Sequence, residues 1–216
     1  MEIRKIMKMF VLSTVILTSL TAHSAFASQN INDHYNFISG GAQFSTFNES
    51  LPNKASNDED ARSKNIVGVY LRASSGLTNN LFTEARVDFS KKNKLKVTDG
   101  LIGAGYVVPL DEDASVYGLM GYSIDSFEFP TQKKNHKGLT GELGVKYQAT
   151  SNWTFEPAIR YADYERSMYE IRVNNTFNVS DDISVEANII QDRIKGTDST
   201  DTIEQTKFLL GARYNF

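Results

Sequence analysis

The sequence predicts an all-β chain: a transmembrane antiparallel up-and-down β-barrel of about ten strands that follows a cleaved signal peptide. Three observations carry this prediction. The chain opens on a basic and then apolar segment, continues in short segments that alternate apolar and polar residues, and ends on an aromatic strand-like segment. No later run is apolar enough for a membrane helix, and a closed barrel is the other structure that spans a bilayer with its backbone groups paired.

Residues 1–27 form the expected signal peptide. Three basic residues precede an apolar run from 9 to 20, and Ala25-Phe26-Ala27 supplies an A-x-A cleavage site. The run is shorter than the roughly 20 residues of a spanning helix, so we expect cleavage after Ala27 and a barrel domain over 28–216. The chain has no cysteine, so an exported product must fold without disulfides.

The mature chain would be acidic. The full chain has 23 Lys and Arg against 26 Asp and Glu, and residues 1–27 hold three of the basic and one of the acidic residues, which leaves 20 against 25. A general nucleic-acid binder would show a basic surplus. We therefore expect no nucleic acid among the partners.

The mature chain divides into segments whose lengths suit spanning strands of about 9–11 residues. An eight-stranded barrel with longer loops is the alternative. Pro157 and Asn175 fit the pattern poorly, because proline removes a ladder hydrogen bond and Asn175 falls on an outward row, so we expect a bulge near one or both. The expected strands are 34–46, 65–75, 80–90, 95–108, 114–126, 137–148, 152–163, 167–179, 182–193 and 203–216.

Alternation defines two faces in the clearest segments, 80–90, 137–148, 182–193 and 203–216. The segments 34–46, 95–108 and 114–126 are rich in glycine and ambiguous in face. Polar turns of a few residues, such as 149–151 and 180–181, alternate with the connections 47–64, 91–94, 127–136, 164–166 and 194–202. Short periplasmic turns and longer extracellular loops are typical of an outer-membrane barrel, and an even strand number places both termini in the periplasm.

The charged rows should face inward. Arg86 alone would cost roughly 2–4 kcal/mol on the lipid side near the midplane. Charges of both signs can pair in a narrow interior and close it, or they can line a polar conduit, and the sequence leaves both open. Besides Asp192 and Lys207, the expected interior charge network is Arg72, Glu84, Arg86, Asp88, Glu142, Lys146, Glu156, Arg160, Glu170, Arg172, Glu186 and Arg213.

The sequence offers no catalytic constellation. After residue 27 only His34 and His136 remain as histidines, with no Ser or acidic set at a telling spacing. We expect His136 to be a solvated loop residue, and we expect no enzyme activity, no cofactor and no metal site.

Basic and aromatic residues gather in two expected outer loops. They could contact lipopolysaccharide phosphates or host surface molecules through charge attraction, or simply keep the surface soluble. The candidate contacts are Lys91, Lys92, Lys94, Phe127, Phe129, Lys133, Lys134 and Lys137.

The Gly-Tyr pieces 105–106 and 121–122 and the closing segment 211–216 resemble small single-chain outer-membrane barrels, which include the attachment-invasion, opacity and porin-like proteins. In length and pattern the chain is also similar to the accessory colonization factor A proteins. The resemblance implies a cell outer membrane location and insertion by the barrel-assembly machinery. The residues of the implied assembly signal are Phe208, Leu210, Tyr214 and Phe216.

These observations lead to an expected function. The closed-looking interior, the missing catalytic set and the charged loops favour a monomeric surface protein of a Gram-negative bacterium. It would sit among outer-membrane lipid and lipopolysaccharide and act in adhesion or host colonisation through its extracellular loops. A small porin-like channel for polar solutes is the alternative.

Overall fold

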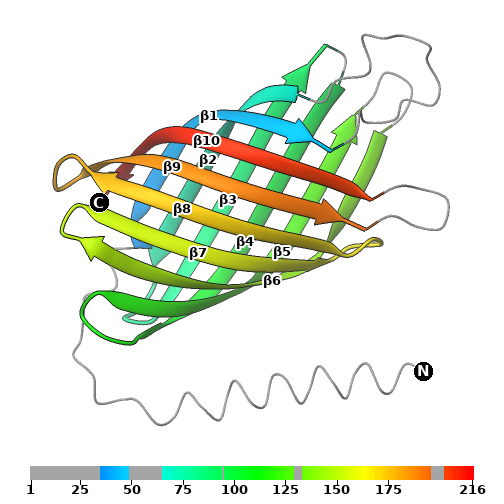
Figure 1. Cartoon of the computed structure of the whole chain (residues 1–216). Helices are drawn as coiled ribbons and strands as arrows, with labels where there is room; N and C mark the ends of the chain where they lie inside the picture. Colours follow the sequence, from blue (N-terminus) through cyan, green and yellow to red (C-terminus); the bar gives the residue numbers. More distant parts are fainter. Residues whose placement is uncertain (1–34, 49–64, 94, 129–132, 196–201) are drawn as a thin grey trace, which may run out of the picture.

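A computed structural model describes residues 35–48, 65–93, 95–128, 133–195 and 202–216. Each strand pairs antiparallel with its neighbours in sequence, and β1 pairs with β10 from Phe37↔Asn215 to Phe47↔Gln205, so the sheet closes on itself (Figure 1). The expected ten-stranded barrel is confirmed, and the eight-stranded alternative is wrong. The strands are β1 Phe37–Phe47, β2 Asn65–Gly76, β3 Leu81–Lys92, β4 Leu95–Pro109, β5 Ala114–Glu128, β6 Lys133–Thr150, β7 Trp153–Asp163, β8 Met168–Asn178, β9 Ile183–Ile194 and β10 Ile203–Asn215.

The two ends of the barrel differ in their connections. At one end, which we name the turn end, turns of a few residues join β2 to β3, β4 to β5, β6 to β7 and β8 to β9. The last described residue lies there too, where the Phe216 amide donates to the Asn36 carbonyl at 3.1 Å. The other end, the loop end, carries the remaining connections (Figure 1). The expected signal peptide, 1–27, lies outside the described residues. No helix in the described ranges is long and apolar enough to cross a membrane.

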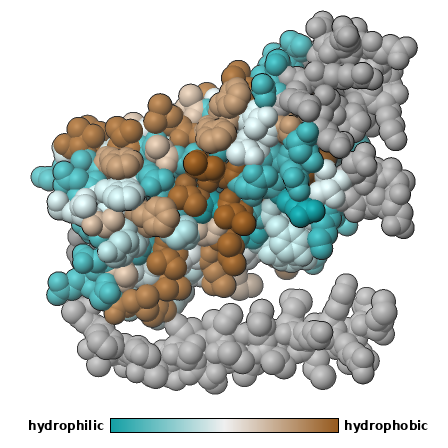
Figure 2. All heavy atoms as spheres, in the orientation of Figure 1, coloured by the Kyte–Doolittle hydropathy of each residue, from teal (hydrophilic) through white to brown (hydrophobic). Residues whose placement is uncertain are grey.

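The wall of the barrel is apolar on the outside. Alternate residues along each strand are exposed and mostly aliphatic or aromatic, as with Met120 at 78% and Leu139 at 71%. Apolar side chains gather over the wall in Figure 2, and polar ones gather toward the loop end. The outward rows are those that the alternation predicted.

The β5–β6 hairpin is longer than the sequence suggested. Its register runs unbroken from Ala114↔Tyr147 to Glu128↔Lys133, so most of 127–136 is strand rather than loop. Lys91 and Lys92 likewise belong to β3. The alternation continues in this part of the hairpin, but charged and amide side chains replace apolar ones on the outward face. The apolar alternation in the sequence therefore stops before these strands end.

The expected bulges are also wrong. The β7–β8 and β8–β9 registers pass Pro157 and Asn175 without a shift. Pro157 instead leaves a gap in the β6–β7 ladder, and the one register shift there lies at Gln148/Thr150, beside the turn. The Asn175 amide is satisfied on the wall, since it donates to the Ala187 carbonyl at 3.1 Å and accepts from the Trp153 indole at 3.3 Å.

Candidate functional site in the barrel interior

A buried carboxylate occupies the middle of the barrel. Glu142 on β6 accepts hydrogen bonds from Arg86 on β3 at 2.6 and 2.9 Å and from Arg172 on β8. Its side chain is 0% exposed, and the Tyr117 hydroxyl donates to it at 2.9 Å. Buried charges persist when they are paired and hydrogen-bonded in this way. The cluster joins distant strands across the interior.

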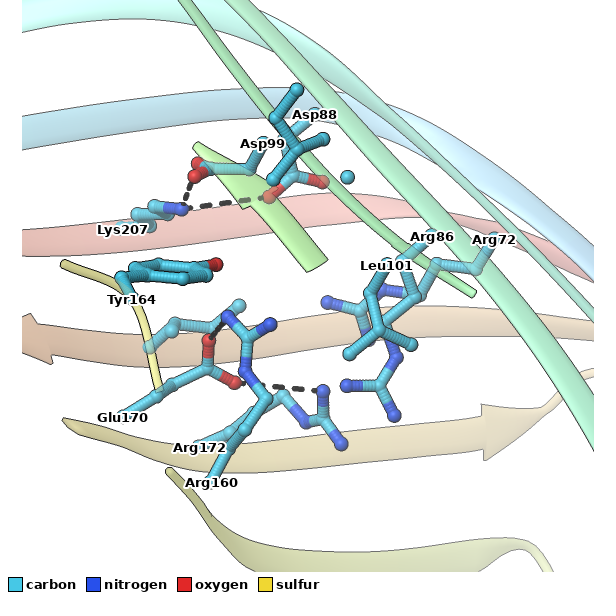
Figure 3. A pocket seen from close by; sticks show the side chains of 13 residues that line it. Arg72, Arg86, Asp88, Asp99, Leu101, Arg160, Tyr164, Glu170, Arg172 and Lys207 are labelled. Carbon is cyan, nitrogen blue, oxygen red and sulfur yellow. Dashed lines mark hydrogen bonds and ion pairs between the residues drawn. The ribbon is translucent and has the colours of Figure 1, made fainter. Parts of the chain in front are cut away.

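Further ion pairs fill the space around Glu142. Arg86 also holds Glu84 at 2.5 Å, and Glu170 receives Arg160 and, at 3.7 Å, Arg172 (Figure 3). Nearer the turn end, Arg213 pairs with Glu186 at 2.5 Å and Lys146 with Glu156 at 3.7 Å. Arg72 donates to Asn174 at 3.3 Å. The structure thus places every residue of the expected charge network inside the barrel.

Close packing on the interior face produces a testable difference between two glycines of β6. A Cβ on Gly144 would meet the Tyr117 ring at 2.4 Å, whereas a Cβ on Gly141 would meet nothing within 4 Å. We expect Gly144→Ala to lower the free energy of unfolding by about 1–3 kcal/mol, because overpacking displaces the tyrosine that donates to Glu142. Gly141→Ala is the matched control and should leave it nearly unchanged. Urea unfolding of the two variants measures the difference, and equal losses would contradict this account.

A row of three aspartates and one histidine crosses the half of the interior nearer the loop end, and we name it the aspartate row. Asp88 on β3 lies directly opposite Asp99 on β4, Asp99 opposite Asp125 on β5, and Asp125 opposite His136 on β6. The Lys207 ammonium reaches the row from β10: it contacts Asp99 and lies 3.7 Å from Asp88 (Figure 3).

Sequence reasoning missed Asp99, Asp125 and His136 in this row. The glycines of β4 leave the face of Asp99 ambiguous in the sequence, and Asp125 lies next to residues 127–136, which the sequence predicts as a loop. His136 is not a solvated loop residue: it is 8% exposed, and its ring stacks on Tyr164 at 6.5 Å. The spacing from Asp125 to His136 across one hairpin could have indicated that the two share a face.

The surroundings of the aspartate row limit the reactions and ligands that it can support. Asp125 Oδ1, His136 Nδ1 and, on β9, Asp192 Oδ1 are buried and have no hydrogen-bond partner among the described residues. A carboxylate and an imidazole can exchange protons with a substrate that reaches them. The cavities beside the row, however, measure only about 30 and 10 Å³, enough for roughly one water molecule. Within the described residues no group of three ligands is placed to hold a metal ion. In this structure the row binds the Lys207 ammonium, which also lies 2.9 Å from Asp192 on β9.

An apolar cluster lies inside the loop end of the barrel, and we name it the plug. Phe127, expected in an outer loop, is part of it at 3% exposure, so its assignment as an outer contact is wrong. The reason is the extended β5, which turns Phe127 toward the interior. The plug comprises Phe47, Ile66, Leu95, Val97, Phe127, Ala162, Tyr164, Met168 and Ile194, with Ile203 packed against it.

A larger polar pocket of about 190 Å³ lies at the turn end. Its lining includes Lys146, Glu156 and Arg213. It shares no lining residue with the cavities beside the aspartate row. Beside Lys146 of this pocket, the aromatic rings of Tyr35, Phe82 and Tyr117 pack together, with centroids 4.3 to 6.4 Å apart. The described residues of these two parts of the interior therefore line separate cavities.

The family model described as outer membrane protein beta-barrel domain matches residues 13–216. The chain belongs to this family. As an outer-membrane barrel it lies in the cell outer membrane, with its exposed apolar wall in lipid. Its turn end then faces the periplasm and its loop end the exterior, as in other barrels of this kind.

Several solved structures are similar to this chain, and the first named here agrees with the barrel in fold. The outer membrane protease OmpT from Escherichia coli is 12% identical, with a TM-score of 0.53 and 91% of this chain and 100% of that chain covered. The attachment invasion locus protein Ail of Yersinia pestis is 16% identical, with a TM-score of 0.39 and coverage of 83% and 97%. Neisserial surface protein A is 14% identical, with a TM-score of 0.42 and coverage of 83% and 96%. No curated protein matches the chain in sequence.

The remaining candidate contacts of this outer-membrane barrel separate by strand face. All the described lysines among them are exposed near the loop end. Lys92 lies on the same interior-facing side of β3 as Glu84, and Lys134 on the same side of β6 as Glu142. The other three lysines, Lys91, Lys133 and Lys137, lie on the outward side of these strands. Lys94 and Phe129 lie outside the described residues. The expected assembly signal lies on the outer wall, with Phe208, Leu210, Tyr214 and Phe216 exposed by 47%, 63%, 51% and 65%.

Proposed function

We propose that this outer-membrane barrel is a non-conducting surface protein that acts in adhesion or host colonisation through its extracellular rim. The observation that carries the proposal is the filled interior. Glu142 is held between two arginines in the middle, and the plug lies at the extracellular end. A protein built in this way presents its outer surface to partners and does not depend on a bore. We also propose that it works as a monomer and has no enzyme activity.

The rim lysines support this proposal. Lys92 and Lys134 are exposed on interior-facing rows at the loop end, each directly opposite a plug residue, Leu95 and Phe127 respectively. Their ammonium groups therefore lie around the closed mouth, where a polymer or protein approaching from outside the cell would meet them first. Sulfate, phosphate and carboxylate groups on host surface molecules are complementary to such a positive rim.

Attachment of bacteria to host cells tests the role of the rim. We expect Lys92→Glu/Lys134→Glu to weaken attachment about tenfold, equal to about 1.4 kcal/mol of binding free energy. Lys92→Arg/Lys134→Arg keeps the charge and should attach like the wild type. Undiminished attachment of the charge-reversed variant, at equal surface amounts, would contradict the proposal. Deleting residues 127–136 is a poorer test, because it also takes Phe127 and His136 from the interior.

The alternative function is a narrow channel for polar solutes, and the polar 190 Å³ pocket at the periplasmic end is the observation in its favour. Planar-bilayer recording of the purified, folded barrel separates the two functions. We expect no discrete current steps, because ion pairs cross the middle of the described interior and the plug lies at its loop end. Reproducible steps whose size changes in Lys146→Glu, a residue of that pocket, would favour the channel instead.

A further inference from the structure

Four charged residues form a row across the outer face of β3, β4, β5 and β6, close to the extracellular end. Lys91 lies directly opposite Lys96, Lys96 opposite Glu128, and Glu128 opposite Lys133. The three lysines are exposed and Glu128 is half-buried. Because side chains alternate along a strand, these four share the face of the lipid-exposed residues. We name them, together with Lys137 on the same face of β6, the wall row.

The wall row carries more positive charge than its own carboxylate can balance. Glu128 pairs with Lys96 at 2.9 Å. In the described part of the chain, no carboxylate pairs with Lys91, Lys133 or Lys137. Lys91 and Lys96 also face each other across the β3–β4 ladder, and like charges in that position repel. An anion bound between them would turn this repulsion into attraction.

The height of the wall row on the barrel indicates which anion reaches it. Lys91 lies two residues beyond Phe89 on the outward face of β3, and Lys137 lies two residues beyond Leu139 on β6. Phe89 and Leu139 are exposed by 49% and 71%, so they mark the upper edge of the apolar wall. The lysines therefore begin where hydrocarbon ends and lipid headgroups start. Outward-facing side chains at this height meet headgroups rather than solutes above the mouth.

We propose that the wall row binds the phosphate groups of a phosphorylated lipid in the extracellular leaflet of the outer membrane. Ammonium groups form strong charge-assisted hydrogen bonds with phosphate oxygens, and basic clusters beside a membrane select anionic headgroups. Lys91 and Lys133 are three strand spacings apart, about 14 Å, with Glu128 between them. This spacing suits a lipid that carries two separated phosphates.

Binding of defined lipids to the purified barrel in uncharged detergent tests the proposal. The probes are bisphosphorylated lipid A, the same lipid without its phosphates, and inorganic phosphate. We expect tight binding of the first only. Lys91→Gln/Lys133→Gln/Lys137→Gln should weaken it on the order of 100-fold, from about fivefold for each ammonium group near the anionic surface. Equal binding of the phosphate-free lipid would overturn the proposal, and so would inorganic phosphate that competes at low concentration.

Two controls make the result specific to the wall row. Lys92→Gln/Lys134→Gln removes charge from the interior-facing rows of the same two strands, and it should bind the lipid like the wild type. An equal loss in this variant would mean that general positive charge, not the wall row, holds the lipid, and would refute the proposal. Heat-modifiable gel migration verifies folding of each variant. The rim lysines tested for attachment are different residues, so the two proposals can fail separately.

Discussion

Replacing Glu142 by Gln should lower the free energy of unfolding by about 3 kcal/mol, the lower part of the range for breaking a buried ion pair. Gln keeps the shape of the side chain but not its charge, so Arg86 and Arg172 lose the carboxylate between them. The expected loss of unfolding free energy is at the lower end of that range because Glu84 still contacts Arg86 and Glu170 still contacts Arg172. Urea titration in detergent micelles, followed by gel mobility of the folded form, measures the change.

Two further variants determine whether burial is the cause. Glu128→Gln breaks an exposed pair with Lys96 on the outer face, and it should leave the unfolding midpoint nearly unchanged, because exposed ion pairs contribute little. Adding Arg86→Met to Glu142→Gln removes one of the unbalanced cations and should restore part of the stability. If Glu142→Gln unfolds at the wild-type urea concentration, the ion pairs do not hold the interior together.

The second large effect is expected at Lys207. Its ammonium contacts Asp88, Asp99 and Asp192, and its side chain is 2% exposed. Lys207→Met keeps an unbranched chain of similar length but leaves several carboxylates facing one another without a cation. We expect a loss of about 3–5 kcal/mol, measured by the same urea titration at neutral pH.

Charge removal provides the matched test for Lys207. Asp192→Asn added to Lys207→Met should recover at least about 1 kcal/mol, since contacting residues are strongly coupled. Lys96→Met, on the outer wall, is the control and should unfold like the wild type. A double variant less stable than Lys207→Met would show that Asp192 is needed for its hydrogen bonds rather than for its charge.

A structural feature of this barrel is predictable from the sequence where its signal is local. The β3 row Glu84, Arg86 and Asp88 was predictable, because each charged residue alternates with an apolar one that must face lipid. Asp99 was not, because the glycines of β4 remove the alternation on which that inference depends. His136 and Phe127 were misplaced for a related reason: beyond the lipid boundary the outward residues become charged, and the pattern no longer distinguishes strand from loop.

The outer-membrane barrel, its strand number and the two faces of most strands were determined by the sequence alone. Period-two alternation is a local property, and the cost of charge in lipid fixes its direction. Only the tertiary structure decided which charges meet. Glu142 is 56 residues from Arg86 and 30 from Arg172, and they come together because the sheet closes with a particular stagger between strands. The length of the β5–β6 hairpin put Phe127 into the plug, His136 beside Asp125 and Lys133 beside Glu128 on the wall.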